Sequence, residues 1–260
     1  MATPAKPKRG TAVAVPKAKI NLPVDVAAQM AAEIEAFKGR IAAPTGSRIG
    51  TDEKLFTLPN GDTSDTLSVI IVDFVSYNAY YDKPWNPNQI VPPNCFSIGL
   101  EPAGMVPSEN SPEMQAESCA ACWANQWKSS ATGNGKACSN TKLLAVIAPD
   151  DPEAPLMLLK VTATALKSFD AYVTGVARSF QRPPRGVITE ITFDPNQKYS
   201  SLRFGNPVAC TPEQLALAYS RKDDAMERLM VEPDVSAFEA APAAPVRGKA
   251  PAKASARKAA

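Results

Sequence analysis

The fold of this chain is decided by the stretch Leu67-Ser68-Val69-Ile70-Ile71-Val72-Asp73-Phe74-Val75. Apolar residues fill it nearly throughout, and most of them are β-branched or aromatic, which is typical of a strand. We therefore predict a strand over 66–75 at the centre of a sheet. A shorter strand is predicted over 54–58, and the Asn-Gly turn signal in Pro59-Asn60-Gly61-Asp62 joins the two.

Further strands and helices are predicted on both sides of this central strand. The strands cover 95–100, 142–147, 156–164, 187–193 and 202–204, and the second of them is interpreted as a continuation of the first across an insertion. Helices are predicted over 23–39, over 165–180, and from a capping box at Thr211 to near Val231.

The order of these elements indicates the fold class. Three strands, a helix and two more strands follow one another, which is the order of the OB barrel, whereas a parallel α/β fold needs helices that alternate with strands. We predict a mainly β fold with added helices (α+β). In detail, we expect an OB-like antiparallel barrel with flanking helices and one long inserted loop.

The insertion carries a cluster of cysteines. Four of the chain's five cysteines are Cys95, Cys119, Cys122 and Cys138, and the fifth, Cys210, stands alone. Disulfides, a redox Cys-x-x-Cys pair and a four-thiolate metal site are the competing interpretations. The N-terminus shows no apolar run that would indicate secretion, so disulfides are not expected, and a redox pair needs no outlying cysteines.

A metal site accounts for all four cysteines of the cluster. Zinc prefers tetrahedral thiolates, and Cys119 and Cys122 form a Cys-x-x-Cys knuckle that Cys95 and Cys138 can complete. Four thiolates leave no position for water, so we predict a structural zinc ion in a loop insertion over 101–141. The alternative is that some of these cysteines are ordinary buried thiols.

Composition argues against an enzyme and places positive charge at the two ends of the chain. The 260 residues include no histidine, which removes the commonest general base and the usual ligands of a catalytic zinc. Ten of the 28 basic residues lie in 1–23 and 240–260, so the other 18 face all 26 acidic residues and leave a net charge of −8 between the ends. We expect disordered tails over 1–22 and 233–260 around one domain over 23–232.

Aromatic and basic side chains recur beside the predicted strands. Single-stranded nucleic acid needs aromatic rings for its bases and cations for its phosphates, although these aromatics could equally form the rim of the core. The candidate stacking residues are Tyr77, Tyr80, Tyr81, Trp85 and Trp127, and the candidate phosphate ligands are Lys128, Lys136, Lys142, Arg182, Arg185 and Arg203.

The cysteine run also resembles a known family. An OB-like core with a zinc subdomain is similar to the single-stranded-DNA-binding proteins of tailed bacteriophages, and Cys119-Ala120-Ala121-Cys122-Trp123 through Gly135-Lys136-Ala137-Cys138 looks like cysteine clusters of phage-encoded proteins. The resemblance covers about 54–205. It implies non-enzymatic binding of single-stranded DNA in phage DNA replication or recombination, in the cytoplasm of a bacterial host, with replication or transcription proteins as further partners.

Two other function classes stay open. A structural or adaptor protein, such as a virion or polymerase-associated subunit, would use the zinc loop for protein contacts, and the net charge of −8 favours it because this charge repels a polyanion. An enzyme is the least favoured class; Asp150 and Asp151 would then be the acids that hold a metal, although such a pair is more commonly a solvated turn. No stretch approaches the roughly 20 apolar residues that span a bilayer, so we expect a soluble protein without membrane contact.

Overall fold

The computed structural model describes residues 26, 29–30, 47–83, 91–151 and 155–236. The chain divides into two compact units, Met1–Thr45 and Gly46–Ala260. In the first unit, Val26, Gln29 and Met30 are helical, and the rest of the predicted helix over 23–39 lies outside the described residues. The predicted tails lie outside them as well, except for 233–236.

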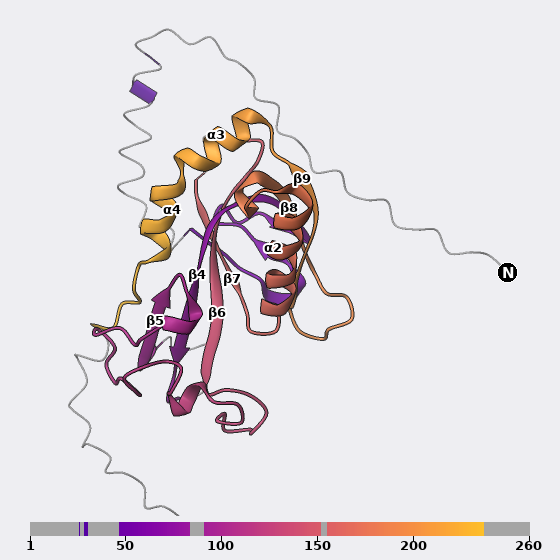
Figure 1. Cartoon of the computed structure of the whole chain (residues 1–260). Helices are drawn as coiled ribbons and strands as arrows, with labels where there is room; N and C mark the ends of the chain where they lie inside the picture. The colour runs from indigo at the N-terminus through magenta and orange to yellow at the C-terminus, as the bar shows by residue number, and fades with distance from the viewer. Residues whose placement is uncertain (1–25, 27–28, 31–46, 84–90, 152–154, 237–260) are drawn as a thin grey trace, which may run out of the picture. The chain divides into compact units, whose positions relative to one another are not determined.

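A seven-stranded mixed sheet, curled into a half-barrel, forms the body of the second unit (Figure 1). Its strands follow the order β1-β7-β6-β4-β8-β9, and β5 also pairs with β4. The mixed sheet with its helices confirms the α+β prediction. All neighbouring strands are antiparallel except β1 and β7, which are parallel, so the expectation of a purely antiparallel sheet is wrong. The strands are β1 (Arg48–Ile49), β4 (Thr66–Tyr80), β5 (Cys95–Gly99), β6 (Cys138–Ile147), β7 (Met157–Val161), β8 (Val187–Phe193) and β9 (Leu202–Ala209).

Strand β4 is central, as its sequence predicts, and it extends five residues beyond the predicted end. On one side it pairs with β6 along Ile70–Tyr80. On the other side its first five residues pair with β8 and its last five residues pair with β5. The interpretation of 95–100 and 142–147 as one continued strand is therefore wrong, because β5 and β6 lie on opposite sides of β4.

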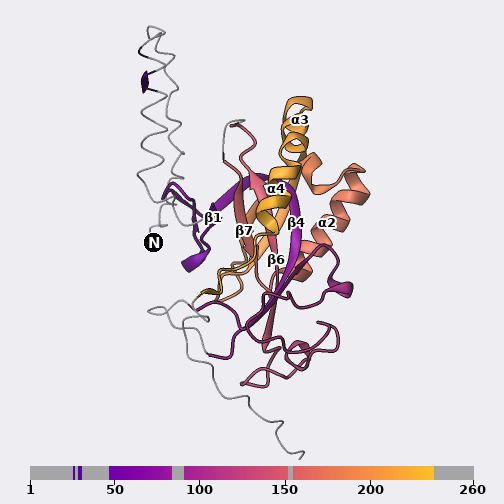
Figure 2. The same cartoon turned by 90° about the vertical axis from the view of Figure 1, so that its left-hand side faces the viewer.

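Helices cover both faces of the sheet (Figure 2). Helix α2 (Leu166–Phe180) packs on the face that receives Val69 and Ile71 of β4, and we call this the α2 face. Helices α3 (Pro212–Ser220) and α4 (Lys222–Leu229) pack on the face that receives Ile70 and Val72, the α3/α4 face. Alternate residues of β4 are thus buried in two separate cores, which explains why the strand is apolar nearly throughout.

The predicted capping box at the start of α3 is confirmed. Gln214 N donates to Thr211 Oγ1 (3.3 Å), and Thr211 N donates to Gln214 Oε1 (3.0 Å). The predicted single helix is interrupted at Arg221, so α3 and α4 are separate.

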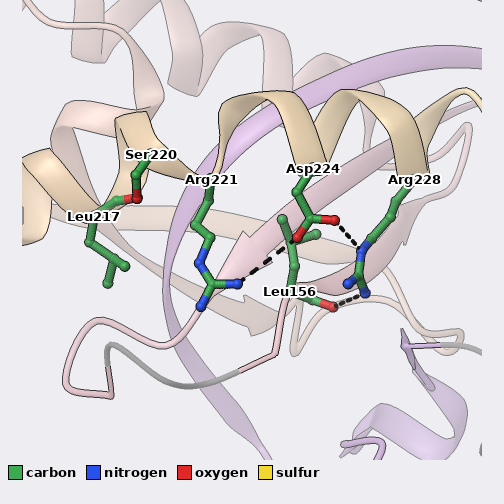
Figure 3. Close-up of polar contacts among 6 residues, drawn as sticks. All are labelled: Leu156, Leu217, Ser220, Arg221, Asp224 and Arg228. Carbon is green, nitrogen blue, oxygen red and sulfur yellow. Dashed lines mark hydrogen bonds and ion pairs between the residues drawn. The ribbon is translucent and has the colours of Figure 1, made fainter.

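Helix α4 is tied to the sheet through its polar side chains (Figure 3). Arg228 Nε donates to Asp224 Oδ1 (2.8 Å), and Arg228 Nη1 donates to the carbonyl oxygen of Leu156, just before β7 (3.4 Å). Arg221 lies 4.0 Å from the same Asp224. The contact of Arg228 with Leu156 supplements the burial of Leu229 and links α4 to the segment that leads into β7.

The smaller elements differ more from prediction. Strand β2 (Phe56–Thr57) pairs with β3 (Thr63–Ser64) in a separate two-stranded sheet, so the strand predicted over 54–58 does not pair with the central strand. Gly61 in its turn adopts a φ of +89°, which favours glycine. Short 3-10 helices lie at Asp52–Lys54, Pro102–Gly104, Trp123–Asn125 and Pro184–Gly186. Within the described part of the chain, no helix is both long and apolar enough to cross a membrane.

Candidate nucleic-acid interface and metal centre

A groove of about 420 Å³ on the α3/α4 face brings two tyrosines and two cations together. Tyr77 and Tyr81 come from the end of β4, Arg48 from β1 and Lys160 from β7. We call this the tyrosine groove; its other lining residues are Val91, Pro92, Pro93, Thr141, Leu143, Pro233, Asp234 and Ser236. Aromatic rings beside cations suit a ligand that carries flat rings and negative charge.

Strand register explains why these residues meet. Tyr77 lies opposite Thr141 on β6, and Lys160 of β7 lies opposite Leu143, two residues further along β6. Leu143 belongs to the α3/α4 core, so this side of the sheet is the α3/α4 face. Because side chains alternate between the faces of a strand, Tyr81 extends the row that Tyr77 begins.

The two cations of the groove have no carboxylate partner among the residues that the structure describes. Asp234 lines the groove, but its carboxylate accepts a hydrogen bond from Ser236 N (2.9 Å). Burial and the positive charge of Arg48 lower the pKa of Lys160. Burial, followed by the neighbouring Tyr81, raises the pKa of Tyr77 to about 12. Arg48 and Lys160 thus line the groove without forming an ion pair, and with Asp234 as the acid in the same lining they leave it an excess of positive charge, which suits an anion.

The other predicted aromatics lie elsewhere. Tyr80 lines a second cavity with Phe96, and its ring centroid lies 5.5 Å from that of Trp123. Trp127 is 69% exposed on the loop that carries the cysteines. Trp85 lies outside the described residues. Tyr77 and Tyr81 are therefore the predicted stacking residues that the structure brings together.

Two of the predicted phosphate ligands are engaged within the fold. Lys142 lies 3.0 Å from Asp170, and its Nζ stands 5.2 Å from the ring centroid of Phe74. Arg182 Nη1 donates to the carbonyl oxygens of Gly186 and Cys210, each at 3.4 Å. The Lys142–Asp170 ion pair links β6 to α2. The two hydrogen bonds of Arg182 link the residue before β8 to the residue after β9.

Arg185 is also part of the fold. Its Nη2 lies 3.0 Å from Asp73 Oδ2, and its guanidinium stands 5.4 Å from the ring centroid of Tyr219. The side chains of Arg185 and Asp73 are only 15% and 16% exposed. The pair fastens the 3-10 helix at Pro184–Gly186 to β4.

Replacing Arg185 by alanine is expected to lower the free energy of unfolding by about 3 kcal/mol, because the mostly buried carboxylate of Asp73 then loses its cation. Urea unfolding followed by circular dichroism measures the change. Arg203→Ala, which removes an exposed cation of β9, serves as the matched control and should cost less than about 0.5 kcal/mol. A loss below about 1 kcal/mol for Arg185→Ala would contradict a structural ion pair.

The remaining predicted phosphate ligands are exposed but scattered. Lys128 lies beside Trp127 in the left-handed backbone region, with a φ of 71°. Lys136 Nζ donates to Asn125 Oδ1 (2.9 Å) on the same loop. Arg203 lies on β9, opposite Thr192. The structure therefore does not bring the six predicted cations into one groove.

The four clustered cysteines line one small cavity of about 20 Å³. Cys95 and Cys138 begin β5 and β6, and both pair with Tyr80, so they flank the last residue of β4 on its two sides. Cys119 and Cys122 come from the loop. A cavity of this size has room for a single atom or ion.

The Cys-x-x-Cys knuckle is held in place by the two amide side chains that follow it. Asn125 Nδ2 donates to the carbonyl oxygen of Cys119 (2.7 Å), and Gln126 Nε2 donates to that of Cys122 (3.2 Å). Cys119 N in turn donates to the carbonyl oxygen of Met105 (3.0 Å). Sequence reasoning did not assign these amides, although they lie only three and four residues after Cys122.

All five cysteines are free thiols. Burial raises the pKa of Cys138 to about 12, and the neighbouring Cys119, Cys122 and Cys95 add to the effect. Within the described residues, however, no group of three or more histidine, cysteine, aspartate or glutamate side chains is arranged so that it could hold a metal ion. Cys210 lies apart from the cluster, in the α3/α4 core.

Sequence reasoning missed the two cations of the tyrosine groove. Lys160 could have been found from the sequence, because it is the one charged residue in the apolar stretch Leu156-Met157-Leu158-Leu159-Lys160-Val161. It lies two residues after Leu158, so in a strand both side chains point to the same face, the α3/α4 face. Arg48 carried none, because the two residues of β1 are too few to show a strand pattern.

No protein-family model matches this chain, and no match is found among curated proteins or solved structures.

Proposed function

We propose that this protein is a non-enzymatic single-stranded-DNA-binding protein that serves phage DNA replication or recombination. The tyrosine groove is the observation that carries the proposal. Phosphates bind Arg48 and Lys160, and bases stack on Tyr77 and Tyr81. Because every base has a flat aromatic face and every nucleotide has a phosphate, the site binds with little base preference.

Strand order supports an OB-like interpretation of the sheet. β4, β6 and β7 are antiparallel neighbours, α2 follows the third of them, β8 returns beside β4, and β9 pairs with β8. This is the order of the five OB strands, although no pairing between β7 and β9 closes the barrel in the described residues. OB folds bind oligonucleotides on the face of their second and third strands. In this chain those strands are β6 and β7, which line the tyrosine groove.

A fluorescence-anisotropy titration with a labelled dT oligonucleotide tests the proposal. We expect tighter binding to the single strand than to a duplex of equal length. The logarithm of the affinity should fall against the logarithm of the salt concentration, with a slope of about −0.7 for each phosphate that a cation neutralises. Equal affinity for both forms of DNA, or affinity without salt dependence, would sink the proposal.

Lys160 makes DNA binding sensitive to alkaline pH. Its charge is present below its pKa and is lost as the pH rises through it, and burial and Arg48 lower this pKa from the ordinary 10.5. We therefore expect the affinity to decline as the pH rises, and this decline should begin before the pH reaches 10.5. A dA oligonucleotide is the suitable probe, because adenine has no group that loses a proton in this range.

Lys160→Arg is the matched variant for this pH titration. Its guanidinium stays charged, so the decline should disappear while the affinity at neutral pH is retained. A decline of equal size in both proteins would assign the effect to another group.

We further propose that Cys95, Cys119, Cys122 and Cys138 hold a structural zinc ion. The donor set fits the metal, since four thiols line one cavity with room for a single ion. When bound, zinc supplies a cross-link and no open position for water. The cysteine side chains then tie the starts of β5 and β6 to the loop between them.

The adaptor function stays the second candidate because large apolar side chains are exposed in the inserted loop. Met114 is 60% exposed, Val106 is 58% exposed and Trp127 is 69% exposed. Methionine and tryptophan are enriched at protein interfaces, and exposed apolar side chains close together can mark one. A loop variant, Met114→Ser/Trp127→Ser, that retains DNA affinity but no longer pulls down replication or transcription proteins from infected cells would favour this function.

A further inference from the structure

A buried asparagine holds the backbone on both sides of Tyr81. Asn94 is 7% exposed. Its backbone N donates to the carbonyl oxygen of Tyr80 (2.9 Å), and its side-chain Oδ1 accepts a hydrogen bond from Asp82 N (3.0 Å). Tyr81 lies between these two anchored residues, with its ring in the tyrosine groove.

Tyr81 depends on this clamp because it lies just past the end of β4. The last residue of β4 that pairs with β5 and β6 is Tyr80, so the sheet itself does not fix the next residue. Tyr81 is 40% exposed, so packing against its neighbours constrains only part of the residue. The two hydrogen bonds of Asn94 supply the missing constraint.

The other two polar groups of Asn94 are also bonded, both to Glu113 of the inserted loop. Asn94 Nδ2 donates to Glu113 Oε2 (3.3 Å), and Glu113 N donates to the carbonyl oxygen of Asn94 (2.8 Å). The side chain must therefore accept at Oδ1 and donate at Nδ2 at the same time, which an amide can do and an ionised aspartate cannot.

We infer that Asn94 is a positioning residue for base stacking on Tyr81, with Glu113 as its brace. The inference rests on the proposed function. Pro92 and Pro93 directly precede Asn94 and line the same groove, so the clamp also fixes the wall that faces the tyrosine ring. An aromatic platform held in place loses less freedom when a base stacks on it, and the affinity is higher for that reason.

A double-mutant cycle measures this positioning role. Asn94→Ala should weaken binding to a dT oligonucleotide about tenfold in the wild-type background, and less than about twofold in the Tyr81→Ala background, because the stacking is then already lost. Equal losses in both backgrounds would overturn the inference, since general damage to the fold does not depend on Tyr81. Asn196→Ala, which removes an exposed amide in the turn between β8 and β9, away from the residues that line the groove, is the control and should leave the affinity unchanged.

A charge-swap pair guards against a variant that fails to fold. Asn94→Asp places a carboxylate against Glu113 and should weaken binding. Asn94→Asp/Glu113→Gln restores the hydrogen bond with its direction reversed, so the affinity should return to within about twofold of wild type. Failure of this rescue in a folded double variant would contradict the brace. If wild type and all variants fail to bind dT, the proposed function fails and the inference with it, whereas binding that is equal in all of them overturns the inference alone.

Discussion

The variant Arg48→Glu/Lys160→Glu is expected to bind a dT oligonucleotide at least roughly 100-fold more weakly than wild type at low salt. Each substitution removes a proposed phosphate ligand and puts a carboxylate in its place, and these two cations are the ones that line the tyrosine groove. The fold should be retained, since both side chains reach solvent at the groove and neither forms an ion pair with a described residue. Anisotropy titration over a range of salt concentrations measures the loss, and the salt slope should flatten with it.

A matched variant separates the groove from the net charge of the protein. Lys167→Glu/Arg178→Glu makes the same change in formal charge on the outer surface of α2, where both residues are exposed. Since charges further apart than about 10 Å are screened at moderate salt, this variant should lose less than about fivefold. Similar losses in the two variants would mean that the whole surface, and not the groove, attracts the DNA.

Much of the fold follows from local sequence signals. The apolar run of β4 predicts the central strand, the helical spacing that begins at Leu166 predicts α2, and the capping box at Thr211 predicts the start of α3. In each case a single segment contains the whole physical cause, because periodicity and capping act within a few residues.

Strand pairing was less predictable because it is not local. A short strand shows no signal for the edge that it will join, and β5 and β6 both carry apolar residues that suit either side of β4. β4 is long enough for β8 and β5 to follow one another along the same side, which leaves the opposite side to β6. Only the complete set of strands decides this arrangement.

The candidate site was predictable in part, and alternation along β4 marks the limit. Tyr77 and Tyr81 have the same phase, whereas Tyr80 has the opposite phase and lines the cysteine cavity instead. If the predicted strand had been extended to Tyr80, the alternation of side chains between the two faces of a strand would have predicted this separation. The cations could not be assigned in the same way, since Lys142 and Arg185 find acidic partners that lie 28 and 112 residues away in the sequence.

Cys119→Ser/Cys122→Ser is expected to reduce the zinc content of the purified protein from about one ion per chain to nearly none. Two thiols cannot hold zinc as four do, and a hydroxyl is a poor replacement for a thiolate. The two hydrophobic cores should survive, since none of the four clustered cysteines belongs to either of them. Elemental analysis measures the metal, and circular dichroism checks the fold.

The consequence of zinc loss should be local to the inserted loop, and limited proteolysis is the measurement that shows it. Without the cross-link, cleavage between Glu101 and Ala137 should become faster while the sheet stays resistant. DNA binding should weaken as well, by about tenfold or less, because Asn94 directly precedes Cys95 and links the loop to Tyr81. Cys210→Ser is the matched control, since this thiol lies in the α3/α4 core, and the variant should keep its zinc. Zinc content equal to wild type in Cys119→Ser/Cys122→Ser would refute the metal site, whereas zinc loss with unchanged DNA affinity would show that the loop and the tyrosine groove act independently.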